Sequence, residues 1–167
     1  INLQDIADVE YIVLESHKNA LAGSQYAVVT DSMIVTFSSF EDNILFFHRN
    51  GKFSHFFNCK GESGKEYTGI SDMRVNVATK EIYINDNLKR CVQVYTYNGE
   101  YIRTLKLKST PHNGYLMGTI YNCDEEHILA EDQWHVDELK EQLTNHQPYY
   151  RISTSDGSIS RLPLFIE

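Results

Sequence analysis

Two segments of this chain follow one plan, 48 residues apart: Ile34–Phe53 reads IVTFSSFEDNILFFHRNGKF and Ile82–Tyr101 reads IYINDNLKRCVQVYTYNGEY. Both hold short runs of alternating apolar residues, and both carry Asn-Gly just before their last aromatic residue. A third, weaker copy runs from Ile128 through Tyr150 to Ile159, with Asp-Gly as its turn pair. Alternation with tight-turn pairs predicts β-hairpins, and repetition at this period predicts an array of small sheets that bury their faces against each other.

Each copy is predicted to hold four antiparallel strands. The expected strands lie near 25–30, 33–38, 43–49 and 52–58 in the first copy, 71–77, 81–85, 91–97 and 100–107 in the second, and 115–122, 127–131, 148–155 and 158–164 in the third. Four-stranded units repeated every 40 to 50 residues are typical of β-propeller blades. The predicted fold class is therefore all-β, with about three four-stranded antiparallel blades and one short inserted helix.

The turn pairs also predict how the strands pair. We expect Asn50-Gly51 and its two counterparts to form two-residue turns with positive φ angles between the third and fourth strands of each copy. In the first copy this places His48 opposite Phe53, and Phe46 opposite His55. The two histidines are then not cross-strand partners, which disfavours a metal pair in that hairpin.

The chain is interpreted as a single propeller-like domain or half-propeller over residues 1–167. Its expected parts are a closing strand and linker at 1–23, blade 1 at 24–60, blade 2 at 61–108, and blade 3 at 109–167 with a helical insert at 134–146. The insert is predicted from Val136, Leu139 and Leu143, which fall at helical spacing. The segment Val9–Glu15 reads as a strand without partner strands, and in a closed ring such a strand completes the last blade.

Composition excludes several classes of partner. The formal net charge is −8, and no run is rich in lysine or arginine, which argues against a nucleic-acid or anionic-membrane partner. No apolar run approaches the roughly 18 residues that span a bilayer, and Ile1–Asp5 lacks the basic and apolar pattern of a signal peptide. The protein is then either cytosolic or has lost an export segment.

The second copy carries a family resemblance. Gly61–Tyr67 reads GESGKEY and is followed by Ile82–Asp86, Val92–Tyr95 and Asn98–Ile102. These segments resemble the NHL-related six-bladed β-propeller proteins that many bacteria export, often as lipoproteins. The resemblance implies a periplasmic or cell-surface location and membrane attachment only through a removed lipid anchor. The family's loop reads G-x-G-P-G-E-Y, and Ser63-Gly64-Lys65 replaces its middle Gly-Pro-Gly here.

Three blades make only half of a six-bladed ring. Two explanations are open: the chain is a fragment or shortened relative of a longer protein, or two chains pair half to half as a homodimer that completes one propeller. Symmetric closure is attractive because an open arc leaves two unpaired strand edges, which invite association. An open monomeric arc is the third alternative.

Long connections all leave the strands at one end of the array, which we call the loop face. This face carries the links between the second and third strands of each copy and the links between copies: Ser16–Ser24, Ser39–Asp42, Cys59–Ile70, Asp86–Arg90, Lys108–Gly114 and the helical insert. Rigid scaffolds concentrate function on such loops. The candidate residues for binding a ligand or partner are Glu66, Tyr67, Asp86, Arg90, His112, Trp134 and His135.

Each candidate also has a structural interpretation. Glu66 and Tyr67 either hold a ligand or clasp neighbouring blades, and the clasp is favoured because the motif lies in a repeated structural loop. Asp86 and Arg90 are expected to form a solvated salt bridge that closes their turn. Trp134 either anchors the inserted helix or is an exposed recognition residue.

No pattern of catalytic residues is present. The chain lacks H-x-H, H-x-x-H, H-E-x-x-H, G-x-S-x-G and Walker patterns, so no catalytic or metal-binding residue is predicted. No cofactor is expected, although Ca²⁺ held by channel-facing oxygens is left open because nothing locates it. The predicted function is a non-catalytic binding or scaffold module that recognises a protein or carbohydrate partner through the loop face. The alternatives are a propeller hydrolase or lyase with a channel-bound divalent metal, and a self-assembling structural module.

Overall fold

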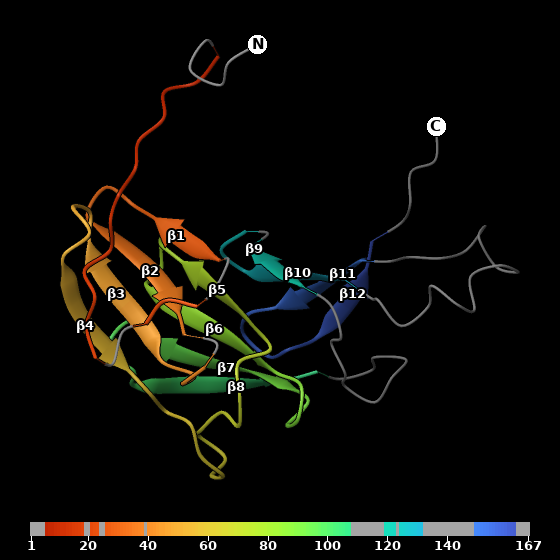
Figure 1. Ribbon diagram of the computed structural model, residues 1–167. Helices are drawn as coiled ribbons and strands as arrows, with labels where there is room; N and C mark the ends of the chain where they lie inside the picture. The colour runs from red at the N-terminus through yellow and green to blue at the C-terminus, as the bar shows by residue number, and fades with distance from the viewer. Residues whose placement is uncertain are drawn as a thin grey trace, which may run out of the picture. The chain divides into compact units, whose positions relative to one another are not determined.

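The computed structural model describes residues 6–18, 21–23, 26–38, 40–107, 119–122, 124–131 and 149–162. These residues form three four-stranded antiparallel sheets, in which consecutive strands are neighbours (Figure 1). The strands are β1 Ala27–Val29, β2 Met33–Phe37, β3 Ile44–His48, β4 Phe53–Phe57, β5 Asp72–Asn76, β6 Glu81–Asp86, β7 Cys91–Thr96, β8 Tyr101–Lys106, β9 Ile120–Asn122, β10 His127–Glu131, β11 Tyr149–Ser153 and β12 Ile159–Arg161.

The expected all-β class is confirmed. The described residues contain no helix, and therefore none that could span a membrane. The predicted helical insert at 134–146 lies outside the described residues. The chain divides into two compact units, Ile1–Phe57 and Asn58–Glu167, which are described separately below.

The 48-residue repeat is visible in the strand pairing. Ile34 lies opposite Phe47 in the sheet of the first unit, and Ile82 lies opposite Tyr95 at the corresponding place in the second. In both hairpins the aromatic residue then pairs with the aromatic residue that follows the turn, Phe53 in the first unit.

The turn chemistry differs from the prediction. Gly51 has φ +84°, but Asn50 does not have a positive φ, and the amide of Gly51 donates to the carbonyl of His48 at 2.8 Å. The turn is therefore a three-residue loop that ends in a left-handed glycine and a bulge. The bulge places Phe53 opposite Phe47, so the expected pairing of Phe53 with His48 is wrong, while the predicted pairing of Phe46 with His55 is confirmed.

The other two turns follow the same principle. Gly99 has φ +82° and closes an identical three-residue loop, because its amide donates to the carbonyl of Thr96. Gly157 has φ +72° and ends a loop one residue longer, in which its amide donates to the carbonyl of Ser153. A single glycine in the left-handed region is needed at each turn, which is why the glycine recurs in all three copies.

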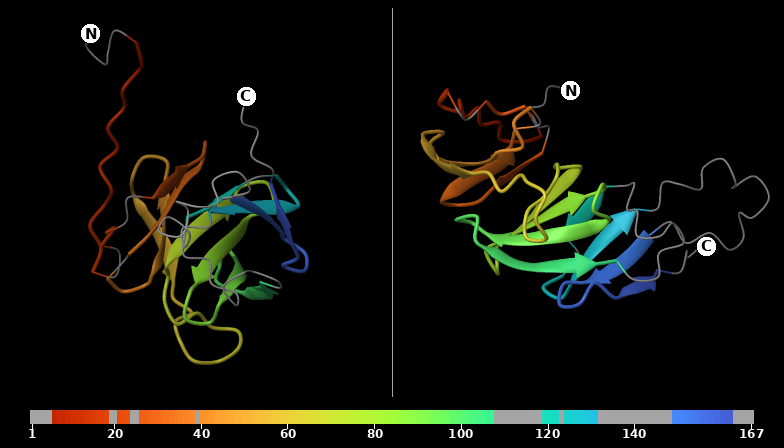
Figure 2. Two further views of the ribbon diagram at one scale, coloured as in Figure 1. Left: turned by 90° about the vertical axis from the view of Figure 1, so that its right-hand side faces the viewer. Right: turned by 90° about the horizontal axis from the view of Figure 1, so that it is seen from below.

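The second unit has one shared core between its two sheets. Alternate residues of β10 and β11 point toward the β5–β8 sheet and are buried, while their neighbours are partly exposed. The buried cluster consists of Tyr83, Val92, Val94, Leu105, Leu107, Ile120, Ile128, Ala130, Tyr150 and Ile152. The two sheets of the second unit lie next to each other in all three ribbon views (Figure 1 and Figure 2), with this shared core between them.

Candidate functional site

The loop Cys59–Thr68, which precedes β5 on the loop face, folds back on itself. The amide of Gly61 donates to the carbonyl of Tyr67 at 2.9 Å, and the amide of Tyr67 donates to the carbonyl of Cys59 at 3.1 Å. The hydroxyl of Tyr67 accepts a third bond, from the amide of Cys59, at 3.0 Å. A side chain at Gly61 would displace the Glu66 carboxylate from its present position.

The ammonium group of Lys89 holds this loop against the β6–β7 turn. Its Nζ donates to three loop carbonyls: Gly61 at 3.2 Å, Ser63 at 2.7 Å and Glu66 at 2.6 Å. Lys89 therefore satisfies backbone acceptors that would otherwise need water, and it does so with charge-assisted bonds. The role of Lys89 was not predicted from the sequence, because its spacing does not indicate that three loop carbonyls surround its ammonium group. We call this arrangement the Lys89 cage.

Tyr67 is fully buried in the same assembly. Its ring packs edge-on against Tyr95, with ring centroids 5.8 Å apart. The hydroxyl of Tyr95 in turn donates to the carbonyl of Lys65 at 2.8 Å, and burial raises the pKa of Tyr95 above its usual range. These contacts lie within the second unit, so Tyr67 ties the loop to its own sheet.

Glu66 uses its carboxylate inside the loop. Its Oε2 accepts a bond from the amide of Ser63 at 2.8 Å. This bond, and to a smaller extent the nearby Lys89 ammonium, lowers the pKa of Glu66. The ionised carboxylate of Glu66 therefore forms a stronger bond to the Ser63 amide than the protonated group would, and so helps to hold the loop in this conformation.

Asp86 is buried beneath the loop. Its carboxylate accepts from the amide and the hydroxyl of Thr68, both at 2.7 Å, and from the amide of Lys89 at 3.0 Å. The description of Asp86 as part of a solvated pair is therefore wrong. Arg90 is exposed and stands at φ +55° at the end of the β6–β7 turn, a backbone position that few non-glycine residues adopt.

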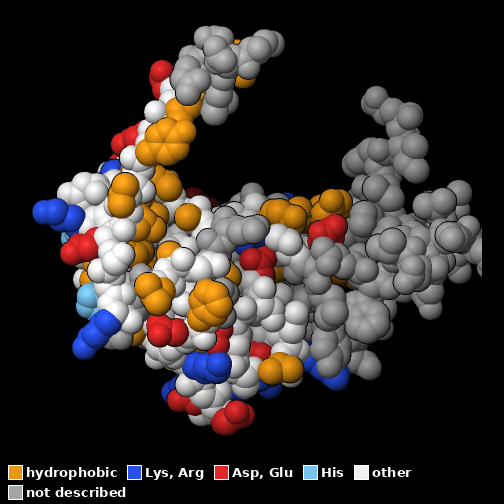
Figure 3. Space-filling view, viewed as in Figure 1, with side chains coloured by type: hydrophobic (Ala, Val, Ile, Leu, Met, Phe, Trp, Pro, Cys, Tyr) orange, Lys and Arg blue, Asp and Glu red, His pale blue; other side chains and the backbone are white. Residues whose placement is uncertain are grey.

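The tip of the loop points into solvent. Glu62, Ser63, Gly64 and Lys65 are all exposed, and Leu88 on the adjacent turn is 80% exposed. The loop is the yellow segment that projects beyond the strands in Figure 1, and charged side chains gather in this region in Figure 3. The site thus combines a fixed backbone with exposed side chains at its tip.

The β2–β3 turn of the first unit, which corresponds to the β6–β7 turn, also exposes an apolar side chain. Phe40, 48 residues before Leu88, is 85% exposed in the β2–β3 loop. Asp42, 48 residues before Arg90, has the same left-handed conformation, with φ +56°. Equivalent turns in two sheets therefore present one large apolar side chain each. The remaining predicted candidates, His112, Trp134 and His135, lie outside the described residues.

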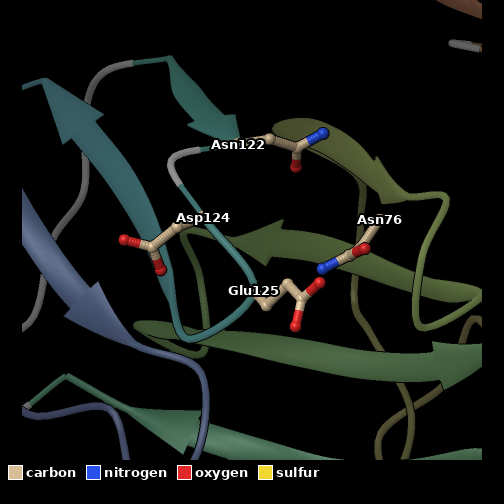
Figure 4. A pocket seen from close by; sticks show the side chains of 4 residues that line it. All are labelled: Asn76, Asn122, Asp124 and Glu125. Carbon is tan, nitrogen blue, oxygen red and sulfur yellow. The ribbon is translucent and has the colours of Figure 1, made fainter.

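A small polar pocket lies at the opposite end of the second unit. It has a volume of about 200 Å³ and is lined by Asn76, Asn122, Asp124 and Glu125, from the end of β5 and the β9–β10 turn (Figure 4). Bonds from the neighbouring His127 and Arg151 help to hold the pKa of Asp124 at about 2. Among the described residues no group of three His, Cys, Asp or Glu side chains could hold a metal ion.

Most of the pocket's polar groups are bonded within the fold. Asn76 accepts from the amides of its own turn, Ala78 and Thr79, and Asn122 donates to the carbonyl of Val75 at 2.7 Å. The pocket is thus a junction between two sheets, lined by side chains that hold local backbone.

Two charged groups join the sheets of the second unit. Asp72 accepts from the guanidinium of Arg74 at 2.8 Å and from the amide of Ile120 in β9 at 2.8 Å. Arg103 forms two bonds to the Glu81 carboxylate and donates to the carbonyl of Thr154 at 2.6 Å. The Arg103 bond is the main reason that the pKa of Glu81 is lowered. A charged residue inside an apolar strand, as in Asp72-Met73-Arg74, is the signal that could have revealed this junction.

Comparison with known proteins supports the fold. One similar crystal structure is that of a Bacteroides fragilis NCTC 9343 protein whose name describes it as exported. The two sequences are 15% identical, the TM-score is 0.66, and the match covers 92% of this chain and 41% of that one. A member of the DUF4221 family from Bacteroides vulgatus ATCC 8482 has 12% identity and a TM-score of 0.64, with 93% and 46% covered. These likenesses concern the fold alone, and this chain spans less than half of each structure.

The family comparison covers nearly the whole chain. No curated protein sequence matches it. A family model described as "Domain of unknown function (DUF4934)" matches residues 1–159. The chain therefore belongs to the DUF4934 family.

Proposed function

We propose that this chain is a non-catalytic binding module, part of an exported six-bladed propeller of the NHL-related kind, that recognises a protein partner through its loop face. The observation that carries the proposal is the recurrence of an exposed apolar side chain, Phe40 and Leu88, at the same position of the β2–β3 and β6–β7 turns. Single exposed apolar residues are common on any protein, but these two are 85% and 80% exposed, against 54% and 50% for Val29 and Val77, another apolar pair 48 residues apart.

The clasped loop beside Leu88 supports the same function. Its backbone is held by Lys89 and Tyr95, whereas its tip carries exposed Glu62 and Lys65. A surface that is ordered before binding loses less conformational entropy when a partner docks. Apolar side chains flanked by charges of both signs suit a protein surface with an apolar pocket and a polar rim.

A protein is favoured over a carbohydrate at this loop. Sugar recognition commonly uses an exposed aromatic face, and the ring of Tyr67 in this loop is fully buried, whereas the exposed ring of Phe40 belongs to a different turn. Export is proposed by analogy with the Bacteroides fragilis protein of similar fold. The ring is proposed from the paired sheets of the second unit and from the greater length of the similar structures.

The proposal is tested by selecting binders from a phage-displayed peptide library on the wild-type chain. The selected peptides are then measured on a Phe40→Ser/Leu88→Ser double variant, for which at least a tenfold loss of affinity is expected. Val77→Ser is the matched control, because Val77 is half exposed in the β5–β6 turn at the opposite end of its sheet. Peptides that bind all three proteins equally would contradict the proposal, and selective binding on a glycan array would favour a carbohydrate.

A further inference from the structure

The two Asn-Gly turns of the repeat differ in how their asparagine is held. In the β3–β4 turn, the Oδ1 of Asn50 accepts a hydrogen bond from the amide of Lys52 at 3.1 Å. In the β7–β8 turn the equivalent amide, that of Glu100, donates at 3.1 Å to the hydroxyl of Thr96 instead. Among the described residues none is bonded to the side-chain amide of Asn98, which is exposed. The two turns share a backbone plan, but only the first fixes its asparagine side chain.

A sequence difference before the turn explains this. Thr96 stands 48 residues after His48, at the same position of the hairpin. A threonine hydroxyl can accept from nearby backbone amides, and that of Thr96 accepts from the amides of both Asn98 and Glu100. The amide that would hold the asparagine side chain is therefore bonded to Thr96.

The glycine after the asparagine is also held less firmly in the second turn. Gly51 is buried, and its carbonyl accepts from the amide of Glu15 at 2.8 Å. A side chain at position 51 would clash with the carbonyl of Val13. Gly99 is partly exposed, and its carbonyl accepts from the thiol of Cys59 at 3.3 Å, which is a weaker kind of bond. Less free energy is then needed to open the second turn locally.

The third glycine turn resembles the first. The Oδ1 of Asp156 accepts from the amide of Ser158 at 3.0 Å, and Gly157 is buried. Two of these three turns therefore fix the side chain that precedes the glycine, and Asn98 is the exception.

We propose that Asn98-Gly99 is a modification site, at which the asparagine deamidates spontaneously in the folded protein while Asn50-Gly51 is protected. The backbone nitrogen of Gly99 attacks Cγ of Asn98 to form a cyclic imide, and the side-chain nitrogen leaves as ammonia with the proton of the Gly99 amide. Water then breaks either carbon–nitrogen bond of the imide and leaves aspartate or isoaspartate. Glycine favours the attack because it has no side chain to obstruct the nitrogen. In the closed turn the Gly99 amide donates to the carbonyl of Thr96, so the reaction starts from a locally opened turn.

The modification changes both the charge and the backbone of the hairpin. Either product adds a carboxylate, and isoaspartate also adds a carbon to the main chain between β7 and β8. The carbonyl of Gly99 accepts from Cys59 at the start of the loop Cys59–Thr68, so the change reaches the base of that loop. This site does not depend on the proposed loop-face function.

Ageing of the wild-type chain tests the site. The protein is incubated in a mildly alkaline buffer, one portion folded and one in urea, and aspartate and isoaspartate are measured by peptide mapping with mass spectrometry. Cleavage after glutamate places Asn50, Asn98 and Asn113 in separate peptides. Asn113, which also precedes a glycine, lies outside the described residues and is followed separately. An unaged portion corrects for deamidation during digestion.

The two portions should behave differently. In the folded chain, Asn98 should deamidate at least about tenfold faster than Asn50, because bonds from Lys52 and Glu15 hold the first turn closed. In urea the two rates should become similar, because the turns no longer exist.

Each other result would overturn the proposal. Equal rates in the folded chain, or a faster reaction at Asn50, would show that the turn contacts do not select the site. An equal excess at Asn98 in urea would assign the difference to the following residues, Lys52 and Glu100, and not to the fold. Deamidation of Asn98 in urea alone would show that its turn stays closed in the folded chain.

Discussion

Replacing Asp72 by alanine should lower the free energy of unfolding by about 3–5 kcal/mol, because it removes the carboxylate that accepts a hydrogen bond from the buried Arg74 guanidinium. The same change removes the acceptor for the amide of Ile120 and so breaks a bond between the two sheets of the second unit. The measurement is the urea midpoint at constant m value, since a changed m value would report altered compactness instead.

Glu10→Ala is the matched control for this experiment. Glu10 also pairs with an arginine, Arg49, but the two side chains are 67% and 37% exposed. Pairs of this kind contribute little to stability, so the midpoint should hardly move. Equal effects of the two substitutions would show that the Asp72 junction does not join the sheets as described.

Replacing Tyr67 by alanine should cost a similar amount, about 3–5 kcal/mol, through the lost burial of a whole ring and the cavity that remains. Tyr67→Phe separates packing from hydrogen bonding. It keeps the edge-on contact with Tyr95 and removes the hydroxyl that accepts from the Cys59 amide, so the expected cost is about 1 kcal/mol. Thermal and urea unfolding of both variants measure the two contributions. A ring exposed for ligand stacking would predict little loss of stability from either change.

The repeat predicted the sheets well, because alternation and glycine turns are local signals. All three final hairpins lie where the turn pairs Asn50-Gly51, Asn98-Gly99 and Asp156-Gly157 indicated. The turn type was wrong, because Asn-Gly suits both a two-residue turn and a three-residue loop with a bulge. Only the strand register and the sign of φ at Asn50 distinguish them.

The candidate site was predictable only in part. The motif Gly61–Tyr67 predicted that this loop is a structural feature, but the expected clasp between neighbouring blades differs from the contacts of Tyr67 with Tyr95 and Cys59, which lie within the second unit. Lys89 could not be predicted, because a lysine in a polar turn carries no sign that its ammonium group will meet three carbonyls. The sequence shows that Phe40 and Leu88 occupy equivalent positions of the 48-residue repeat. Only the structure shows that both side chains are exposed.

The proposed recognition surface includes a loop whose backbone is held by Lys89 and Tyr95 and whose tip side chains are exposed. Such a loop can present Glu62 and Lys65 to a partner only if the Lys89 cage holds the backbone in place. Native-state hydrogen exchange of the loop amides tests this most directly. In the wild type the amides of Gly61, Tyr67 and Thr68 should be protected, while those of Gly64 and Lys65 exchange rapidly.

Lys89→Met keeps much of the side chain's length and removes the ammonium group. In this variant the amides of Gly61 and Tyr67 should lose protection, while those of the distant β10–β11 pair stay protected. That result would show that the Lys89 ammonium group orders the loop of the proposed recognition surface. Rapid exchange throughout the wild-type loop, or unchanged protection in Lys89→Met, would contradict the central claim.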